Sequence, residues 1–189
     1  MNNKLNNNET GFTFIEMIVS VTLFVLVMLA ATQIFQIVVD GQRSALASQN
    51  LQENMRYALE MMSKEIRMAQ RSDTSCGGTT NNKVYNEIED QDFDEFYFKN
   101  KDGECVKYYV DNNRLKIIRD DGTVKTAFVT PDEIKITGLE FYILDNNIST
   151  QNQFQPNVTI LIKVEARKSG TMHKQAMTIQ TTISSRYYE

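Results

Sequence analysis

The distribution of apolar residues divides the chain into parts of different character. Residues 1–11 are polar and show no helical or strand periodicity, whereas residues 17–39 contain no charged side chain. At about 1.5 Å of rise per residue, that uncharged run is long enough to cross a hydrocarbon layer of about 30 Å. Its backbone amides must be satisfied internally in lipid, so we expect a helix over residues 12–39. The Ser and Thr hydroxyls within the run can bond to carbonyls of the preceding turn.

After Gly41 the apolar residues fall on one face of a helix. They recur at spacings of three and four, which predicts an amphipathic helix over residues 40–72. The members of this stripe are Leu51, Met55, Ala58, Leu59, Met62, Ile66 and Ala69. We therefore expect one continuous helix from Phe12 to about Arg71, with the stripe packed on the chain's own globular head.

Beyond a run of small polar residues at 72–82, the period changes to two. Alternating segments separated by short turn sequences predict antiparallel strands. The expected strands cover residues 93–98, 104–110, 114–119, 124–129, 134–144, 158–167 and 173–184. The fold class is therefore α+β, with a long N-terminal helix packed against an antiparallel β-sheet in a β-rich head over residues 73–189.

Composition and charge limit the kinds of binding and catalytic site that the chain can form. The 189 residues include 20 Lys and Arg against 24 Asp and Glu, for a net charge of −4, which argues against a general nucleic-acid binder. One His and two Cys remove most zinc sites and most base-assisted nucleophiles, so we expect no metal, no cofactor and no catalytic site. Cys76 and Cys105 either form a disulfide, which an extracytoplasmic head would permit, or remain two unpaired thiols.

Two other features of the head have ordinary interpretations. Asp90, Asp92 and Asp94 are spaced like ligands of a calcium loop, but Glu95 occupies the sixth position in place of Gly and Lys101 the twelfth in place of Glu. We therefore interpret residues 86–95 as a solvated acidic loop. His173 lies near the start of the last expected strand, outside any catalytic motif.

Glu16 is the residue that a plain membrane anchor does not explain. A carboxylate beside or inside a membrane helix is costly and usually has a partner and a function. The surrounding residues are Gly-Phe-Thr-Phe-Ile-Glu at positions 11–16, behind a short polar leader and ahead of the long apolar run. This arrangement closely resembles the cleavage site of type IV pilins and of the pseudopilins of type II secretion.

The resemblance implies how the chain is processed and assembled. A prepilin peptidase of the membrane would cleave between Gly11 and Phe12, removing a leader of residues 1–11, and the same enzyme would N-methylate Phe12. Glu16 would then be the fifth residue of the mature chain and would meet the amine of a neighbouring subunit during assembly. The family is also typified by a Pro within the membrane helix, whereas the first Pro here is Pro131.

The resemblance also implies partners and a location. These are other pilin or pseudopilin subunits, an assembly platform with its ATPase in the bacterial inner membrane, and membrane lipid before assembly. The chain would be single-pass with an extracytoplasmic head, and it would reach the periplasm or the cell surface in the filament. In this role it is a structural subunit, catalyses nothing and has no nucleic-acid contact that the sequence supports.

The finer assignment stays open. Residues 51–70 and 180–186 are similar to minor pilins and to J-type minor pseudopilins, which leaves a pilus and a secretion pseudopilus as alternatives. A second interpretation is a membrane-anchored extracytoplasmic enzyme or binding module that uses residues 12–39 only as an anchor. A third is a conventionally secreted protein whose mature chain begins near residue 32.

Overall fold

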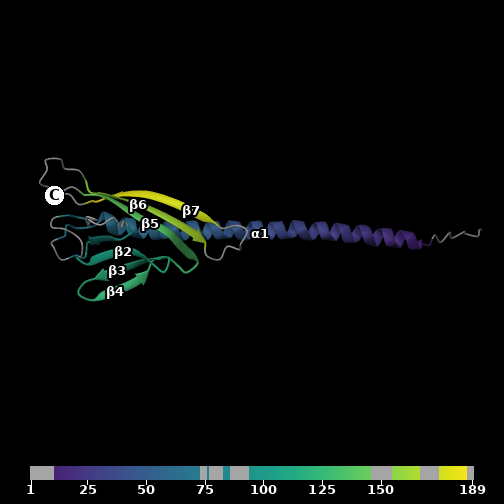
Figure 1. Cartoon of the computed structure of the whole chain (residues 1–189), viewed down its shortest axis with the longest axis horizontal. Coiled ribbons are helices and arrows are strands. Elements are labelled where there is room, and N and C mark those ends of the chain that lie inside the picture. Colours follow the sequence, from purple (N-terminus) through teal and green to yellow (C-terminus); the bar gives the residue numbers. More distant parts are fainter. Residues whose placement is uncertain are drawn as a thin grey trace, which may run out of the picture. The chain divides into compact units, whose positions relative to one another are not determined.

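The computed structural model describes residues 11–72, 76, 83–85, 94–145, 155–166 and 175–186. Within these ranges the chain forms one helix followed by seven strands (Figure 1). The chain separates into two compact units, Met1–Arg43 and Ser44–Glu189. The boundary between the units falls inside the helix, which is α1 (Phe14–Arg67).

In the first unit, α1 contains the uncharged run and has no core of its own. Every residue from 11 to 38 is exposed. The hydroxyls of Ser20, Thr22 and Thr32 donate to the carbonyls four residues earlier at 2.7, 2.7 and 2.8 Å. These bonds confirm the expected internal satisfaction of the hydroxyls, and they leave the outer surface of this part of α1 apolar. The helix continues without a break through Gly41.

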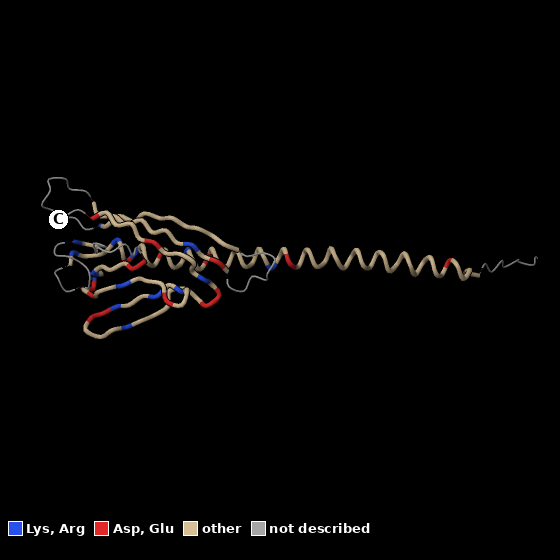
Figure 2. Tube along the Cα trace, viewed as in Figure 1, with Lys and Arg blue, Asp and Glu red and all other residues tan. Residues whose placement is uncertain are grey.

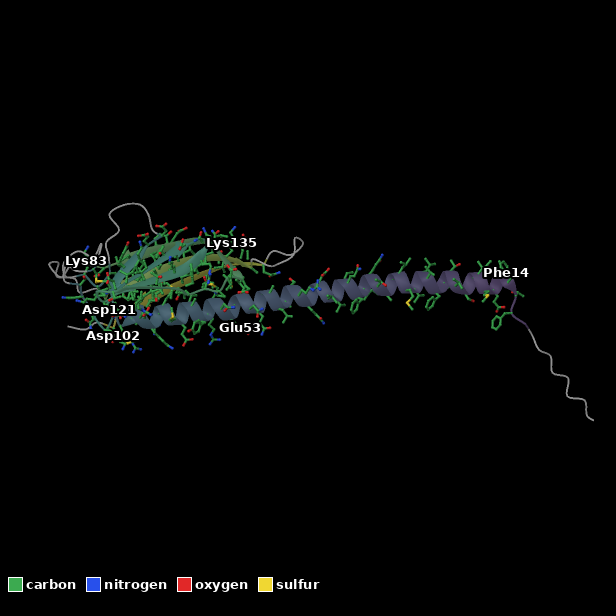
Figure 3. All side chains as sticks on the ribbon, turned by 90° about the horizontal axis from the view of Figure 1, so that it is seen from below. Phe14, Glu53, Lys83, Asp102, Asp121 and Lys135 are labelled. Atoms are coloured by element: carbon green, nitrogen blue, oxygen red, sulfur yellow. A yellow bond between two sulfur atoms is a disulfide. The ribbon has the colours of Figure 1, made fainter. Side chains whose placement is uncertain are left out.

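In the second unit, the last turns of α1 pack by the predicted stripe. The buried helical residues are Leu51, Met55, Ala58, Met62 and Ile66, at the expected spacings of three and four. Figure 1 shows the strands running alongside this part of α1, and Figure 3 shows that Glu53 points away from them. The prediction that the stripe packs on the chain's own head is therefore confirmed.

The helix ends at Arg67, four residues before the expected end near Arg71, so that expectation is wrong. The amides of Met68 and Ala69 donate to the carbonyls three residues earlier, at 3.1 and 3.2 Å, which tightens the last turn. Gln70 then leaves the helix because its amide donates to the carbonyl of Lys99 at 2.8 Å, in an isolated bridge beside the first strand. A strand partner thus replaces the helical hydrogen bonds that periodicity alone predicts.

The strands form two antiparallel sheets, where the sequence indicated an antiparallel sheet without showing its division. The first sheet has the order β1-β2-β3-β4 and the second the order β5-β6-β7. Each strand begins and ends within three residues of its expected position. The bounds are β1 (Phe96–Lys99), β2 (Cys105–Asp111), β3 (Arg114–Asp120), β4 (Val124–Phe128), β5 (Ile134–Leu144), β6 (Asn157–Ala166) and β7 (Ala176–Ser184).

The two sheets share one hydrophobic core. The ring of Phe96 on β1 is stacked at 5.1 Å from that of Phe141 on β5, and it lies 5.3 and 5.4 Å from the rings of Phe98 and Tyr85. All four of these side chains are fully buried. Aromatic packing of this kind adds to the free energy gained by burial, so the core couples the two sheets although they exchange no strand.

A disulfide joins Cys76 to Cys105, with the two Cα atoms 5.3 Å apart. Cys105 is the first residue of β2, opposite Lys99 of β1. The bridge therefore ties the segment that follows α1 to the first sheet.

Candidate processing and assembly site

The residues that resemble a prepilin cleavage site lie at the N-terminal end of α1. Thr13 immediately precedes the first helical residue, Phe14, and its carbonyl accepts the first helical hydrogen bond from the amide of Met17 at 3.2 Å. Its hydroxyl oxygen accepts a long bond of 3.4 Å from the amide of Glu16. Thr13 is therefore the N-cap of α1, because its side chain satisfies one of the amide donors that a helix start leaves unpaired.

Gly11 and Phe12 precede this cap and lie outside the helix. Phe12 is 87% exposed. A Cβ atom built on Gly11 would have no neighbour within 4 Å. The peptide bond between the two residues thus lies in exposed, non-helical backbone that no described residue covers. Such backbone can enter the active site of a peptidase without unwinding a helix.

Glu16 lies one turn further on, in the first turn of α1. A carboxylate in this position is stabilised by the helix dipole, by about 0.3–1 kcal/mol when exposed. The next charged residue along the sequence is Asp40, and Figure 2 shows the long stretch of α1 without acidic or basic residues that precedes it. Glu16 is therefore the only charge that α1 carries before Asp40.

Sequence reasoning missed the part that Thr13 plays. Thr13-Phe14-Ile15-Glu16 fits the pattern of a capping box, in which a Thr at the N-cap is followed three residues later by Glu. The amide of Glu16 makes one of the two bonds of that motif with Thr13. The spacing of the two residues ahead of an apolar run was the available signal, and it identifies residue 13 as the helix start.

The other sequence candidates lie in the second unit or outside the described residues. Cys76 and Cys105 are paired with each other. His173 and residues 86–93 of the acidic stretch fall outside the part of the chain that the structure describes. Among the described residues, no group of three or more His, Cys, Asp or Glu side chains is arranged to hold a metal ion.

Glu95, the last residue of the acidic stretch, has defined partners. The ammonium group of Lys107 lies 2.7 Å from its carboxylate, and the hydroxyl of Tyr97 donates to it at 2.8 Å. Burial raises the pKa of Glu95, but the hydrogen bonds from Lys107 and Tyr97 outweigh burial and hold the pKa below its usual value of 4.5. Glu95, immediately before β1, thus has a structural role beside the first sheet.

By length and composition, α1 is able to cross a membrane. Its most apolar window of 18 residues has a mean hydropathy of 2.5, and none of that window is buried. A soluble helix of a globular protein would cover such a surface with its own core. The exposed run is therefore consistent with a membrane-anchored protein.

Comparison with known proteins identifies the same N-terminal stretch. Residues 6–32 match the prokaryotic N-terminal methylation motif. No curated protein and no solved structure matches the chain. The chain thus carries a type IV pilin-like leader, and its helix and two antiparallel sheets form an α+β, pilin-like architecture. The motif supports processing of the prepilin type, and it belongs to a structural family and not to an enzyme family.

Proposed function

We propose that this chain is a structural subunit, a minor pilin or minor pseudopilin, of a type IV pilus or of a type II secretion pseudopilus. Residues 1–11 are the leader that prepilin peptidase removes, and residues 12–39 form the membrane helix that becomes part of the filament core. Residues 40–72 join this helix to the β-rich head of residues 73–189. Processing cleaves the bond between Gly11 and Phe12 and methylates the new amine of Phe12.

One observation carries the proposal. The first part of α1 exposes apolar side chains on every side and has a single carboxylate in its first turn, directly after an exposed Gly-Phe bond. Burying a Val, Leu, Ile, Phe or Met side chain stabilises by about 1.5–3 kcal/mol, so a surface of this kind requires cover. Lipid supplies that cover before assembly, and the equivalent helices of other subunits supply it in a filament.

Glu16 sets the register of neighbouring helices when the subunit moves from the lipid into the filament. While the subunit is in the membrane, the carboxylate lies at the start of the helix, where water and lipid head groups reach it. In a bundle of staggered helices, the carboxylate meets the Phe12 amine of a neighbouring subunit in apolar surroundings, where opposite charges attract more strongly. An uncompensated buried carboxylate is costly, so a subunit out of register is disfavoured.

The proposed partners follow from this order of processing and assembly. They are the prepilin peptidase and methylase, other pilin or pseudopilin subunits, and an inner-membrane assembly platform driven by its ATPase. The head is extracytoplasmic, in agreement with its disulfide. The ATPase supplies the mechanical work of assembly, and the chain contributes the apolar helix surface and the Glu16 carboxylate.

The test compares Glu16→Gln with Ser20→Ala, which alters a polar side chain one turn further along the same helix. Both variants should insert in the membrane and lose the leader as the unaltered chain does. Quantitative immunoblotting of sheared filaments should show a loss of Glu16→Gln by about tenfold or more, the equivalent of one lost charge pair. Incorporation of Glu16→Gln at the level of Ser20→Ala would contradict the assembly role of Glu16.

A further inference from the structure

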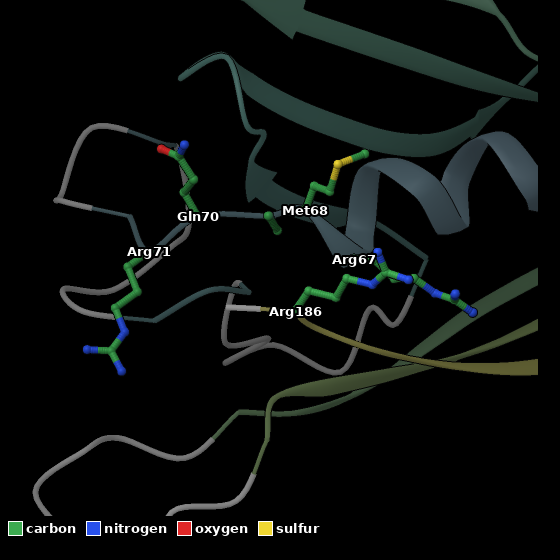
Figure 4. A pocket seen from close by; sticks show the side chains of 6 residues that line it. Arg67, Met68, Gln70, Arg71 and Arg186 are labelled. Carbon is green, nitrogen blue, oxygen red and sulfur yellow. The ribbon is translucent and has the colours of Figure 1, made fainter. Parts of the chain in front are cut away.

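A pocket with a strongly basic lining lies at the C-terminal end of α1, within the second unit (Figure 4). Its volume is about 350 Å³. No acidic residue is among the described residues that line it. Its lining residues are Arg67, Met68, Ala69, Gln70, Arg71 and Arg186.

Two of the arginines are held beside each other by the backbone. The amide of Arg186, just past β7, donates to the carbonyl of Arg67 at 2.7 Å. Figure 4 shows the side chains of Arg67 and Arg186 close together, whereas Arg71 points away from them. Both Arg67 and Arg186 are exposed, and neither forms an ion pair with any other described residue. Two neighbouring like charges repel each other, and an anion bound between them would offset that repulsion.

Capping of the helix does not account for the two guanidinium groups. The last carbonyls of α1 already have donors: Met68 N bonds to Glu65, Ala69 N to Ile66, and Arg186 N to Arg67. The hydroxyl of Tyr85 donates to the carbonyl of Ile66 as well, at 3.0 Å. Within the part of the chain that the structure describes, the guanidinium groups of Arg67 and Arg186 therefore have donors available for a ligand.

The pocket also has an apolar part. Met68 is 43% exposed, whereas Ala69 is buried. A methionine side chain adapts to varied apolar partners, whereas a free inorganic anion gains nothing from it. A guanidinium group binds a carboxylate through two parallel hydrogen bonds, which gives such a pair its geometry. A carboxylate with an apolar neighbour therefore complements this surface better than a simple anion does.

We propose that this pocket is a docking site for an acidic peptide segment of a partner protein. Arg67 and Arg186 bind a carboxylate of the segment between them, and an adjacent apolar side chain packs on Met68. The proposal does not depend on cleavage at Gly11 or on methylation of Phe12, so it and the proposed function can fail separately.

The test uses the full chain in detergent micelles and a fluorescent peptide of residues 86–95, NEIEDQDFDE, as a probe of the required composition. Fluorescence polarisation measures its affinity for the unaltered chain, for Arg67→Gln/Arg186→Gln, and for Arg56→Gln as a control with an exposed arginine elsewhere on α1. A second probe replaces the six acidic residues of the peptide by their amides, and inorganic phosphate serves as a competitor.

The double variant should bind the acidic peptide about tenfold more weakly or worse, because it loses charge-assisted bonds from two guanidinium groups. Arg56→Gln should bind as the unaltered chain does, and the amide peptide should bind no better to the unaltered chain than to the double variant. Arg67→Lys/Arg186→Lys keeps the charge without the paired donors, and its affinity should fall between the two. Binding of the peptide by the double variant within twofold of the unaltered chain would overturn the proposal. If the unaltered chain binds inorganic phosphate but does not bind the acidic peptide, the proposal is overturned too.

Discussion

The carboxylate of Glu65 links α1 to the first sheet through two partners. The hydroxyl of Tyr108, on β2, donates to one carboxylate oxygen, and Nε of Arg119, on β3, donates to the other at 3.1 Å. Tyr108 is fully buried, whereas the side chains of Glu65 and Arg119 are 20% and 36% exposed. Burial and the negative charge of Glu65 raise the pKa of Tyr108, so its hydroxyl stays protonated and remains a donor.

Glu65→Leu is the perturbation that tests this link. It leaves the buried Tyr108 hydroxyl without its acceptor, which costs about 1–3 kcal/mol. The ion pair with the partly exposed Arg119 adds no more than about 1 kcal/mol. An acid in the last turn of a helix is disfavoured by the dipole, and its removal returns a few tenths of a kcal/mol. The free energy of unfolding should therefore fall by about 1–3.5 kcal/mol.

The assay is denaturant unfolding of the full chain in detergent micelles, followed by the near-ultraviolet circular dichroism of the buried tyrosines. Glu65→Leu, Tyr108→Phe and the double variant form a thermodynamic cycle. Tyr108→Phe removes the donor together with its need for an acceptor, so the double variant should be more stable than the sum of the single changes predicts, by about 1–2 kcal/mol. A loss below about 0.5 kcal/mol for Glu65→Leu, or strict additivity in the cycle, would refute the argument.

Two further predictions concern the same unit. Replacement of Cys76 and Cys105 by Ser should lower the free energy of unfolding by about 3–4 kcal/mol, because the disulfide closes a loop with a sequence separation of 29. Equal denaturation midpoints for the Ser variant and the oxidised chain would contradict this. The low pKa of Glu95 means that its pair with Lys107 stabilises the fold above about pH 4.5 and is lost as the pH falls through the folded pKa. The thermal midpoint should therefore drop between pH 5 and pH 3 by less in Glu95→Gln than in the unaltered chain; equal drops would show that Glu95 contributes nothing to acid sensitivity.

Most of the helix and strand positions could be predicted from local sequence patterns. The stripe from Leu51 to Ile66 could be predicted because apolar residues that recur every three or four positions lie on one face of a helix. The turn between β2 and β3 could be placed because Asn112 and Asn113 tolerate the positive φ angles of 51° and 61° that they adopt. Such signals depend on neighbouring residues alone.

The parts that could not be predicted depend on contacts between distant residues. Alternation marks a strand but does not tell which strands pair, so the division into two sheets was not visible. Glu65 lies 43 residues from Tyr108 and 54 from Arg119, and no local pattern relates them. The end of α1 was misplaced for the same reason, since the pairing of Gln70 with Lys99 competes with the helix.

At the candidate site, a short motif in a specific context predicted roles for Gly11, Phe12 and Glu16, and the structure added the helix cap at Thr13. Thr13 was overlooked because the helix was expected to begin at Phe12, which placed Thr13 inside the helix and not at its cap. The pocket around Arg67 and Arg186 was out of reach, because 119 positions separate these residues in the chain and only the end of β7 brings them together.

The proposed function requires that cleavage creates a new amine at Phe12. Mass spectrometry of the amino-terminal peptide, from cells with and without the prepilin peptidase, tests it most directly. We expect a chain that begins at N-methylated Phe12 when the peptidase is present and that retains residues 1–11 when it is absent. A chain that keeps Met1 in both cells, or that begins near residue 32, would contradict it.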